Sequence, residues 1–150
     1  MEERSMIWQR YVIVLCLCLL AVLPAMGQDE FVVIVNTSVS NSTMNQNTIQ
    51  TIFLGKKTEW DDGSPIVPVT LEDSDAQRAF MRKIIKKTPR SFSTYWISRL
   101  YTGKAIPPRS FQTDKDLLDF VESNDGSIGF VTGPASLEGR DHIKKINVVY

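Results

Sequence analysis

One run of residues restricts the fold more than any other part of the chain. Phe31–Val35 is five apolar residues in succession, four of them β-branched. A continuous β-branched run is typical of a strand buried on both faces, and such a strand needs layers of structure on either side of it. Segments with helical periodicity alternate with further strand-like runs along the rest of the chain. The sequence therefore predicts a layered α/β domain, with a mixed sheet flanked by helices.

The boundaries of these elements follow from capping and turn residues. Helices are expected over 49–53, 73–87, 91–103 and 113–121, the last opened by a capping box of Thr113 and Asp116. Strands are expected over 66–69 and 128–131, and a final strand within 143–150. Pro68 places the second strand at a sheet edge or a strand end, because proline lacks the backbone N–H that a sheet requires.

Helix 73–87 is the clearest of these predictions. Acidic residues stand at its start and lysines in its last turn, which is the arrangement that the helix dipole favours. Five apolar residues recur at helical spacing and predict one buried stripe. They are Ala76, Phe80, Met81, Ile84 and Ile85.

The next helix carries an aromatic face, which has two interpretations. Its residues are Phe92, Tyr95, Trp96, Leu100 and Tyr101. Such a face serves either as a stacking platform for a base or sugar or as core packing, and helical spacing among apolar neighbours favours the core.

Residues 1–27 form a segment of a different kind. Tyr11–Leu23 carries no charge, Pro24 follows it, and the small residues Ala25 and Gly27 precede a cut before Gln28. This is the build of a secretory signal peptide, and the apolar run is shorter than the roughly 20 residues of a membrane-spanning helix. We therefore expect a periplasmic protein whose domain spans 28–150, with no stable membrane insertion after cleavage. An uncleaved membrane anchor is the alternative.

The two cysteines, Cys16 and Cys18, both lie in that apolar run. The exported domain would then contain no thiol, which excludes a disulfide framework, a cysteine-based metal site and cysteine catalysis.

Charge argues against a nucleic-acid partner, since 17 basic residues balance 17 acidic ones. The distribution is uneven: Arg78–Arg109 contains nine basic residues and no acid, whereas Glu59–Asp75 contains six acids and no base. A basic face for an anionic partner is one interpretation, and solvated helix ends are the simpler and favoured one.

No catalytic constellation is evident. His142 is the only histidine, and it lacks the partners that a triad or a histidine-based metal site requires. The acids Glu59, Asp61 and Asp62 do not have the spacing of a calcium loop, so a solvated turn is favoured. We expect no enzyme activity, no metal and no cofactor.

Several short motifs occur in an order that carries a resemblance. They are I-F-L-G at 52–55, W-D-D-G at 60–63, I-V-P-V at 66–69, the helix that reaches Phe80, and G-S-I-G-F-V at 126–131. Taken together they resemble the substrate-binding proteins of phosphate ABC transporters, which are class II periplasmic binding proteins. The T-G-K-x-x-P-P element that ends at Pro108 is similar to a short, stand-alone branch of that superfamily.

The resemblance implies a protein of two α/β lobes that close over a ligand, of which this chain has room for one. In the family, an R-x-D-x-S-G-T segment of this lobe binds the anion. Here Thr70 stands at the position of the arginine, Glu72 at the aspartate, Asp75 at the glycine and Ala76 at the threonine, and only Ser74 is retained. Loss of the arginine and a carboxylate at the helix start both oppose phosphate binding.

The candidate ligand residues follow predicted strands, where open α/β sheets usually bind ligands. They are Thr37, Ser38, Thr70, Glu72, Ser74 and Arg78. We expect the two groups, one after each strand, to lie side by side. The leading hypothesis is a non-catalytic exported binding or accessory module for an envelope protein or an unidentified small ligand. The alternative is a phosphate or oxyanion substrate-binding component of an ABC transporter, with a homodimer rebuilding the cleft.

Overall fold

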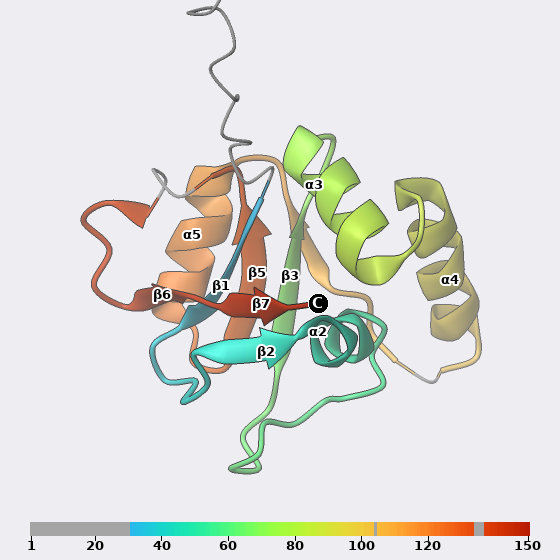
Figure 1. Ribbon diagram of the computed structural model, residues 1–150. Helices are drawn as coiled ribbons and strands as arrows, with labels where there is room; N and C mark the ends of the chain where they lie inside the picture. Colours follow the sequence, from blue (N-terminus) through green and yellow to red (C-terminus); the bar gives the residue numbers. More distant parts are fainter. Residues whose placement is uncertain (1–30, 104, 134–136) are drawn as a thin grey trace, which may run out of the picture.

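The computed structural model describes residues 31–103, 105–133 and 137–150 (Figure 1). The predicted signal peptide, 1–27, with Cys16 and Cys18, lies outside the described residues, as does Lys104. The helices are α2 (Gln46–Phe53), α3 (Asp75–Phe80), the π-helix η1 (Met81–Ile85), α4 (Pro89–Tyr101) and α5 (Asp114–Ser123). The strands are β1 (Val32–Asn36), β2 (Thr43–Asn45), β3 (Val67–Leu71), β4 (Arg109–Phe111), β5 (Ser127–Val131), β6 (Ile143–Lys145) and β7 (Asn147–Val149).

Five strands form one mixed sheet in the order β4-β3-β5-β1-β6. β3 runs parallel to both β4 and β5, whereas β1 runs antiparallel to both β5 and β6. All five residues of β1 are buried, so the strand predicted from the β-branched run is confirmed. The mixed α/β architecture is confirmed with it.

Three short strands were not predicted as such. β4 follows the proline pair before Arg109, and β2 pairs in parallel with β7 outside the main sheet. The segment expected as a single final strand divides at Ile146 into β6, which belongs to the sheet, and β7, which does not. Pairing with distant partners decides these three-residue strands, and local sequence carries no signal for it.

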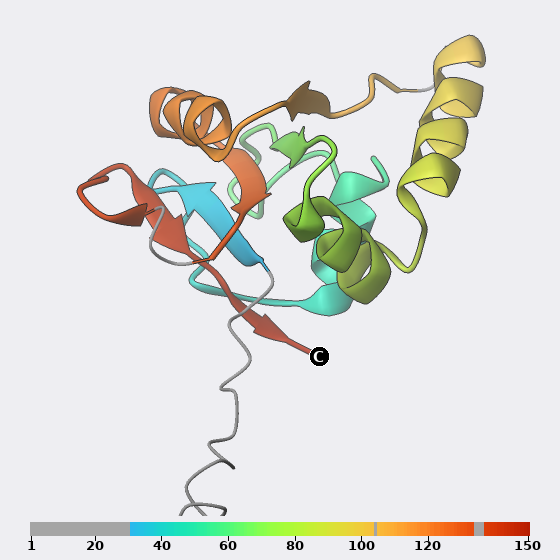
Figure 2. The ribbon, with the colours of Figure 1, turned by 90° about the horizontal axis from the view of Figure 1, so that it is seen from above.

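The two faces of the sheet are covered by different helices, as Figures 1 and 2 show. Successive residues of β5 point to opposite faces. A Cβ on Gly129 would lie 3.1 Å from Leu117 of α5, whereas the ring of Phe130 stacks on Phe80 of α3 at a centroid distance of 4.1 Å. Helix α5 therefore packs on one face, and α2 and α3 pack on the other.

Aromatic rings join the second helical layer to the sheet. Phe80 contacts Phe53 of α2 edge-on at 4.8 Å and Phe31 at 5.4 Å, in addition to its stack on Phe130. Phe53, Phe80 and Phe130 are fully buried. The single side chain of Phe80 thus links α2, α3 and the strand pair β1–β5.

The helix predicted over 73–87 is not one continuous α-helix. It starts with Ser74 as N-cap, changes to a π-helix at Met81, and ends at Lys86, whose φ of 59° is left-handed. The predicted apolar stripe is nevertheless confirmed, since Ala76, Phe80 and Met81 are buried together with both isoleucines of η1.

Helix α4 stands at the margin of the molecule, with one flank against the body (Figure 2). Phe92 and Trp96 are buried, as the core interpretation requires. The prediction was wrong for the end of the same face, because Leu100 is 54% exposed and Tyr101 is 89% exposed. Among the described residues, none packs on this last turn closely enough to bury these side chains.

Arg140 ties the turn before β6 to α5. Its guanidinium lies 2.8 Å from carboxylates of Asp119 and Glu122. Hydrogen bonds from Lys115 and then from Arg140 lower the pKa of Asp119 below its ordinary value.

The first prediction concerns the aromatic core. Phe80→Ala removes the ring that joins the two layers, and we expect the free energy of unfolding to fall by about 3–5 kcal/mol. Urea denaturation measures this change. Tyr101→Ala removes an equally large but exposed ring and serves as the control, with an expected change within about 0.5 kcal/mol. Equal effects for the two variants would contradict the described packing.

The second prediction concerns pH. A carboxylate whose pKa is lowered by folding stabilises the protein above its ordinary pKa of 3.8, and this contribution is lost as the pH falls through the folded value. Arg140→Gln should return the pKa of Asp119 toward 3.8, so the variant should lose less stability than the wild type on acidification. Urea unfolding at about pH 7 and about pH 3 checks this. Lys56→Gln, on the exposed connection after α2, should behave as the wild type does.

Candidate functional site

The turn from β3 into α3 contains most of the predicted site residues. After Leu71 the backbone N–H of Glu72 donates to the carbonyl of Phe111, which holds the start of the turn against β4. Asp73 has a φ of 48°, a left-handed conformation that L-residues other than asparagine and aspartate seldom adopt. Ser74 then caps α3. This sharp turn directs the side chains of Glu72 and Asp73 out of the sheet.

Thr70 is buried at the end of β3, and its hydroxyl lies 3.0 Å from that of Ser110 on β4. Glu72 is half-buried and accepts a hydrogen bond from the amide of Gln112 at 3.2 Å. A neutral hydroxyl and a carboxylate without an ion-pair partner among the described residues thus occupy the positions where the resemblance implies an arginine and an aspartate.

Ser74 and Arg78 are already engaged in local contacts. The hydroxyl oxygen of Ser74 accepts a hydrogen bond from the backbone N–H of Gln77 at 2.9 Å, as an N-cap does. Arg78 pairs with Asp75 at the helix surface, and its side chain is 56% exposed. Arg78, the one basic residue predicted for the site, therefore forms an ion pair with a neighbouring acid of the same helix.

Thr37 and Ser38 do not join this group, which corrects the expectation that the two strand ends lie side by side. They follow β1, which runs antiparallel to β5, whereas β3 runs parallel to β5. The carboxyl end of β1 therefore lies at the opposite end of the sheet from the turn after β3. There the hydroxyl of Ser38 accepts the backbone N–H of Gly126 at 2.9 Å, a structural contact.

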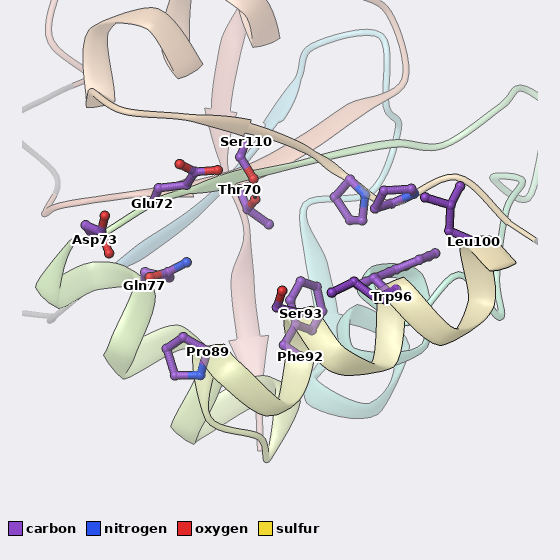
Figure 3. A pocket seen from close by; sticks show the side chains of 13 residues that line it. Thr70, Glu72, Asp73, Gln77, Pro89, Phe92, Ser93, Trp96, Leu100 and Ser110 are labelled. Atoms are coloured by element: carbon purple, nitrogen blue, oxygen red, sulfur yellow. Dashed lines mark hydrogen bonds between the residues drawn. The ribbon is translucent and has the colours of Figure 1, made fainter.

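A groove lies beside the turn after β3, between β3 and β4 on one side and α4 on the other (Figure 3). Its volume is about 360 Å³. Figure 3 shows Glu72, Asp73 and Gln77 toward one end and Trp96 and Leu100 toward the other. The remaining lining residues are Thr70, Pro89, Phe92, Ser93, Ile97, Pro107, Pro108 and Ser110.

The groove is polar at one end and apolar at the other, and among the described residues its lining contains two acids and no basic residue. Carboxylates without a counter-ion repel an anion, whereas an exposed apolar wall favours binding of apolar surface. The sequence predicted Thr70 and Glu72 as site residues. It did not predict Asp73, Gln77 or the prolines Pro107 and Pro108, which also line the groove. The pair of prolines at 107–108, which follows the helix expected over 91–103, was the available signal.

Trp96 forms the floor of the groove, and its ring packs against residues that follow α2. Its ring lies so close to Gly55 that a Cβ there would be 2.6 Å from the indole. The neighbouring Tyr95 donates its hydroxyl hydrogen to the carbonyl of Leu54 at 2.7 Å, which fixes α4 against the end of α2. The indole N–H of Trp96 is buried and has no acceptor among the described residues, an arrangement that costs about 1–3 kcal/mol.

The acidic segment after α2 is a structured turn. The hydroxyl of Ser64 donates to Asp62 and, with the backbone N–H of the same serine, lowers the pKa of that carboxyl group. Lys57 pairs with Asp61 at 2.9 Å. Within the described ranges, no three His, Cys, Asp or Glu side chains gather where they could hold a metal ion. His142 is exposed.

The motifs that carried the resemblance have structural roles. The indole N–H of Trp60 donates to the carbonyl of Gly126 at 2.9 Å and so joins the W-D-D-G turn to the start of β5. A side chain on Gly126 would collide with the carbonyl of Pro65, since its Cβ would lie 2.3 Å from that oxygen. These residues preserve the scaffold and contribute nothing to the groove.

The sequence matches no protein-family model and no curated protein. The fold, however, is similar to several solved structures. An ABC-type phosphate transport receptor from Vibrio cholerae superposes with a TM-score of 0.60 at 18% identity, over 79% of this chain and 46% of that one. A putative phosphate ABC transporter substrate-binding protein with bound phosphate from Clostridium perfringens gives 0.59 at 18%, over 79% and 44%. PstS from Borrelia burgdorferi gives 0.59 at 12%, over 79% and 47%.

These similarities establish the fold, which is that of phosphate-binding proteins, and confirm the predicted resemblance at that level. The chain spans less than half the length of each of these proteins. None of the helices in the described part of the chain has the length and apolar character needed to cross a membrane.

The third prediction tests the support behind the groove. Gly55 and Gly63 both have positive φ, but only Gly55 faces a neighbour, the indole of Trp96. Gly63→Ala should therefore cost about 1 kcal/mol of stability for the backbone alone. Gly55→Ala should cost about 1–3 kcal/mol more, because the indole must move. Urea denaturation with tryptophan fluorescence measures both, and equal costs would contradict the close contact.

Proposed function

We propose that this chain is a non-catalytic binding module, exported to the periplasm, whose binding site is the groove beside α4. One observation carries the proposal: where the resemblance implies an anion site, the described lining of the groove presents the carboxylates of Glu72 and Asp73 and no cation. The scaffold of a phosphate-binding protein is retained without the groups that would bind phosphate. Export rests on the composition of residues 1–27.

The electrostatics of the turn oppose an oxyanion in three ways. Thr70 bonds to Ser110 and offers no charge. Ser74 directs its oxygen to the backbone of α3, and Arg78 pairs with Asp75 at the surface. Each charge-assisted hydrogen bond to an anion contributes about 1.5–3 kcal/mol, so the loss of two weakens binding by roughly a hundredfold or more.

A second candidate function is favoured by the fold itself. One protein of similar fold was solved with bound phosphate, so this chain could be the phosphate or oxyanion substrate-binding component of an ABC transporter. Because the chain spans less than half of that protein, a homodimer would have to rebuild the cleft.

The fourth prediction separates these two functions. Calorimetric titration with phosphate and sulfate up to about 1 mM should show no binding. A Kd at that concentration corresponds to a binding free energy of about −4 kcal/mol. The protein is expressed from its complete coding sequence and purified in the form that the cell produces, and its mass in solution is measured alongside. Micromolar phosphate binding that is lost in Ser74→Ala would overturn the proposal and favour the phosphate-binding function instead. Phosphoester hydrolysis abolished by the same variant would show that the protein is an enzyme.

A further inference from the structure

We propose that the groove binds an extended segment of a partner protein in which apolar side chains are followed by a basic one. This inference rests on the proposed function, because it takes the groove as the binding site, and it adds the chemical class of the ligand. The apolar end of the groove, its acidic end and the exposed surface beyond it each support one part of the assignment.

The apolar end provides a preformed surface for the first part of such a segment. Phe92 and Trp96 of α4 form its floor, and Pro107 and Pro108 line it as well. At about 360 Å³, the groove has the volume of a small ligand site or of two to three side chains. Its aromatic and proline residues have little side-chain freedom to lose on binding, which favours association.

The exposed apolar surface continues past the groove, and this observation favours a protein segment over a small molecule. Large hydrophobic side chains that are more than half exposed are few in the described residues, and four of the six lie on the last turns of α4 or just after it. They are Ile97 at 52%, Leu100 at 54%, Tyr101 at 89% and Ile106 at 86%. A small molecule that fills the groove leaves Tyr101 and Ile106 in water, because neither lines it. An extended segment that passes over α4 covers them.

The acidic end determines the charge of the segment. Glu72 and Asp73 line the groove, and neither forms an ion pair with another described residue; the contact of Glu72 is with the neutral amide of Gln112. A lysine or arginine on the bound segment supplies the missing counter-charge beside the half-buried Glu72 and the exposed Asp73.

The indole N–H of Trp96 is a further polar group that has no described hydrogen-bond partner. Trp96 is 4% exposed, and its indole N–H has no acceptor among the residues that the structure describes. A peptide backbone carries carbonyl oxygens at regular intervals. Because the indole nitrogen is covered in this structure, a carbonyl of a bound segment would accept its hydrogen bond only after the ring shifts.

The test uses two blocked hexapeptides as probes, one with three leucines followed by three lysines and one with three leucines followed by three glutamates. Each is titrated into the isotope-labelled protein, purified as above, and followed by the indole N–H signals in NMR spectra. The signal of Trp96 reports on the groove. The signal of Trp60, whose indole donates to Gly126, reports on the scaffold. We expect the lysine peptide to shift the Trp96 signal alone and to bind roughly tenfold more tightly than the glutamate peptide.

Two variants divide the apolar contribution from the charged one. The double variant Glu72→Gln/Asp73→Asn should weaken the lysine peptide roughly tenfold and abolish the preference between the peptides. Leu100→Ala should weaken both peptides alike. The matched control is Asp61→Asn/Asp62→Asn, which removes two acids from the turn before β3 and should leave both affinities unchanged.

Three outcomes would overturn the inference: no shift of the Trp96 signal by either peptide, equal affinity for both, or no effect of the double variant. A stable dimer whose formation shifts the Trp96 signal would assign the groove to a second copy of this chain instead. These failures are separable from failure of the proposed function. Phosphate binding refutes the proposed function directly, whereas silence toward both peptides and phosphate refutes only the ligand class.

Discussion

The stack of Phe80 on Phe130 is the interaction on which the rest of the structure depends. It fixes α3 against the centre of the sheet, and through Phe53 it fixes α2 as well. Because Phe80 is only a few residues beyond the turn after β3, the same contact sets where Glu72 and Asp73 point. The end of α2 then holds α4 through Tyr95 and Gly55. The position of the groove is thus a consequence of packing in the aromatic core.

The molecule separates scaffold from binding chemistry. Residues that resemble those of phosphate-binding proteins, such as Trp60 and Gly126, make backbone contacts that any ligand specificity could retain. In the function proposed here, the residues that distinguish one ligand from another lie at the end of β3 and along α4. Fold similarity over less than half of a phosphate-binding protein therefore says more about how this chain packs than about what it binds.

Sequence reasoning found most of the fold because local signals agreed with the packing. The β-branched run predicted β1, the acidic start of 73–87 and the capping box at Thr113 predicted two helices, and the stripe that includes Phe80 predicted a buried face. The order of the motifs also indicated that the turn after β3 is a candidate site. It misplaced Thr37 and Ser38 beside that turn, because strand direction depends on partners that are distant in sequence.

What the sequence determined by itself was the type of the longer elements, the buried stripe and the neutral side chain at Thr70. Periodicity, capping and side-chain chemistry are local properties, and the residues concerned carry them before the chain folds. The tertiary structure decided the mixed sheet order, the three-residue strands and the groove itself. β4 meets β3 only after the chain has passed through α3 and α4, and the far end of α4 stays exposed although its sequence pattern continues the buried face. Such contacts arise from the closure of long loops, so no local pattern encodes them.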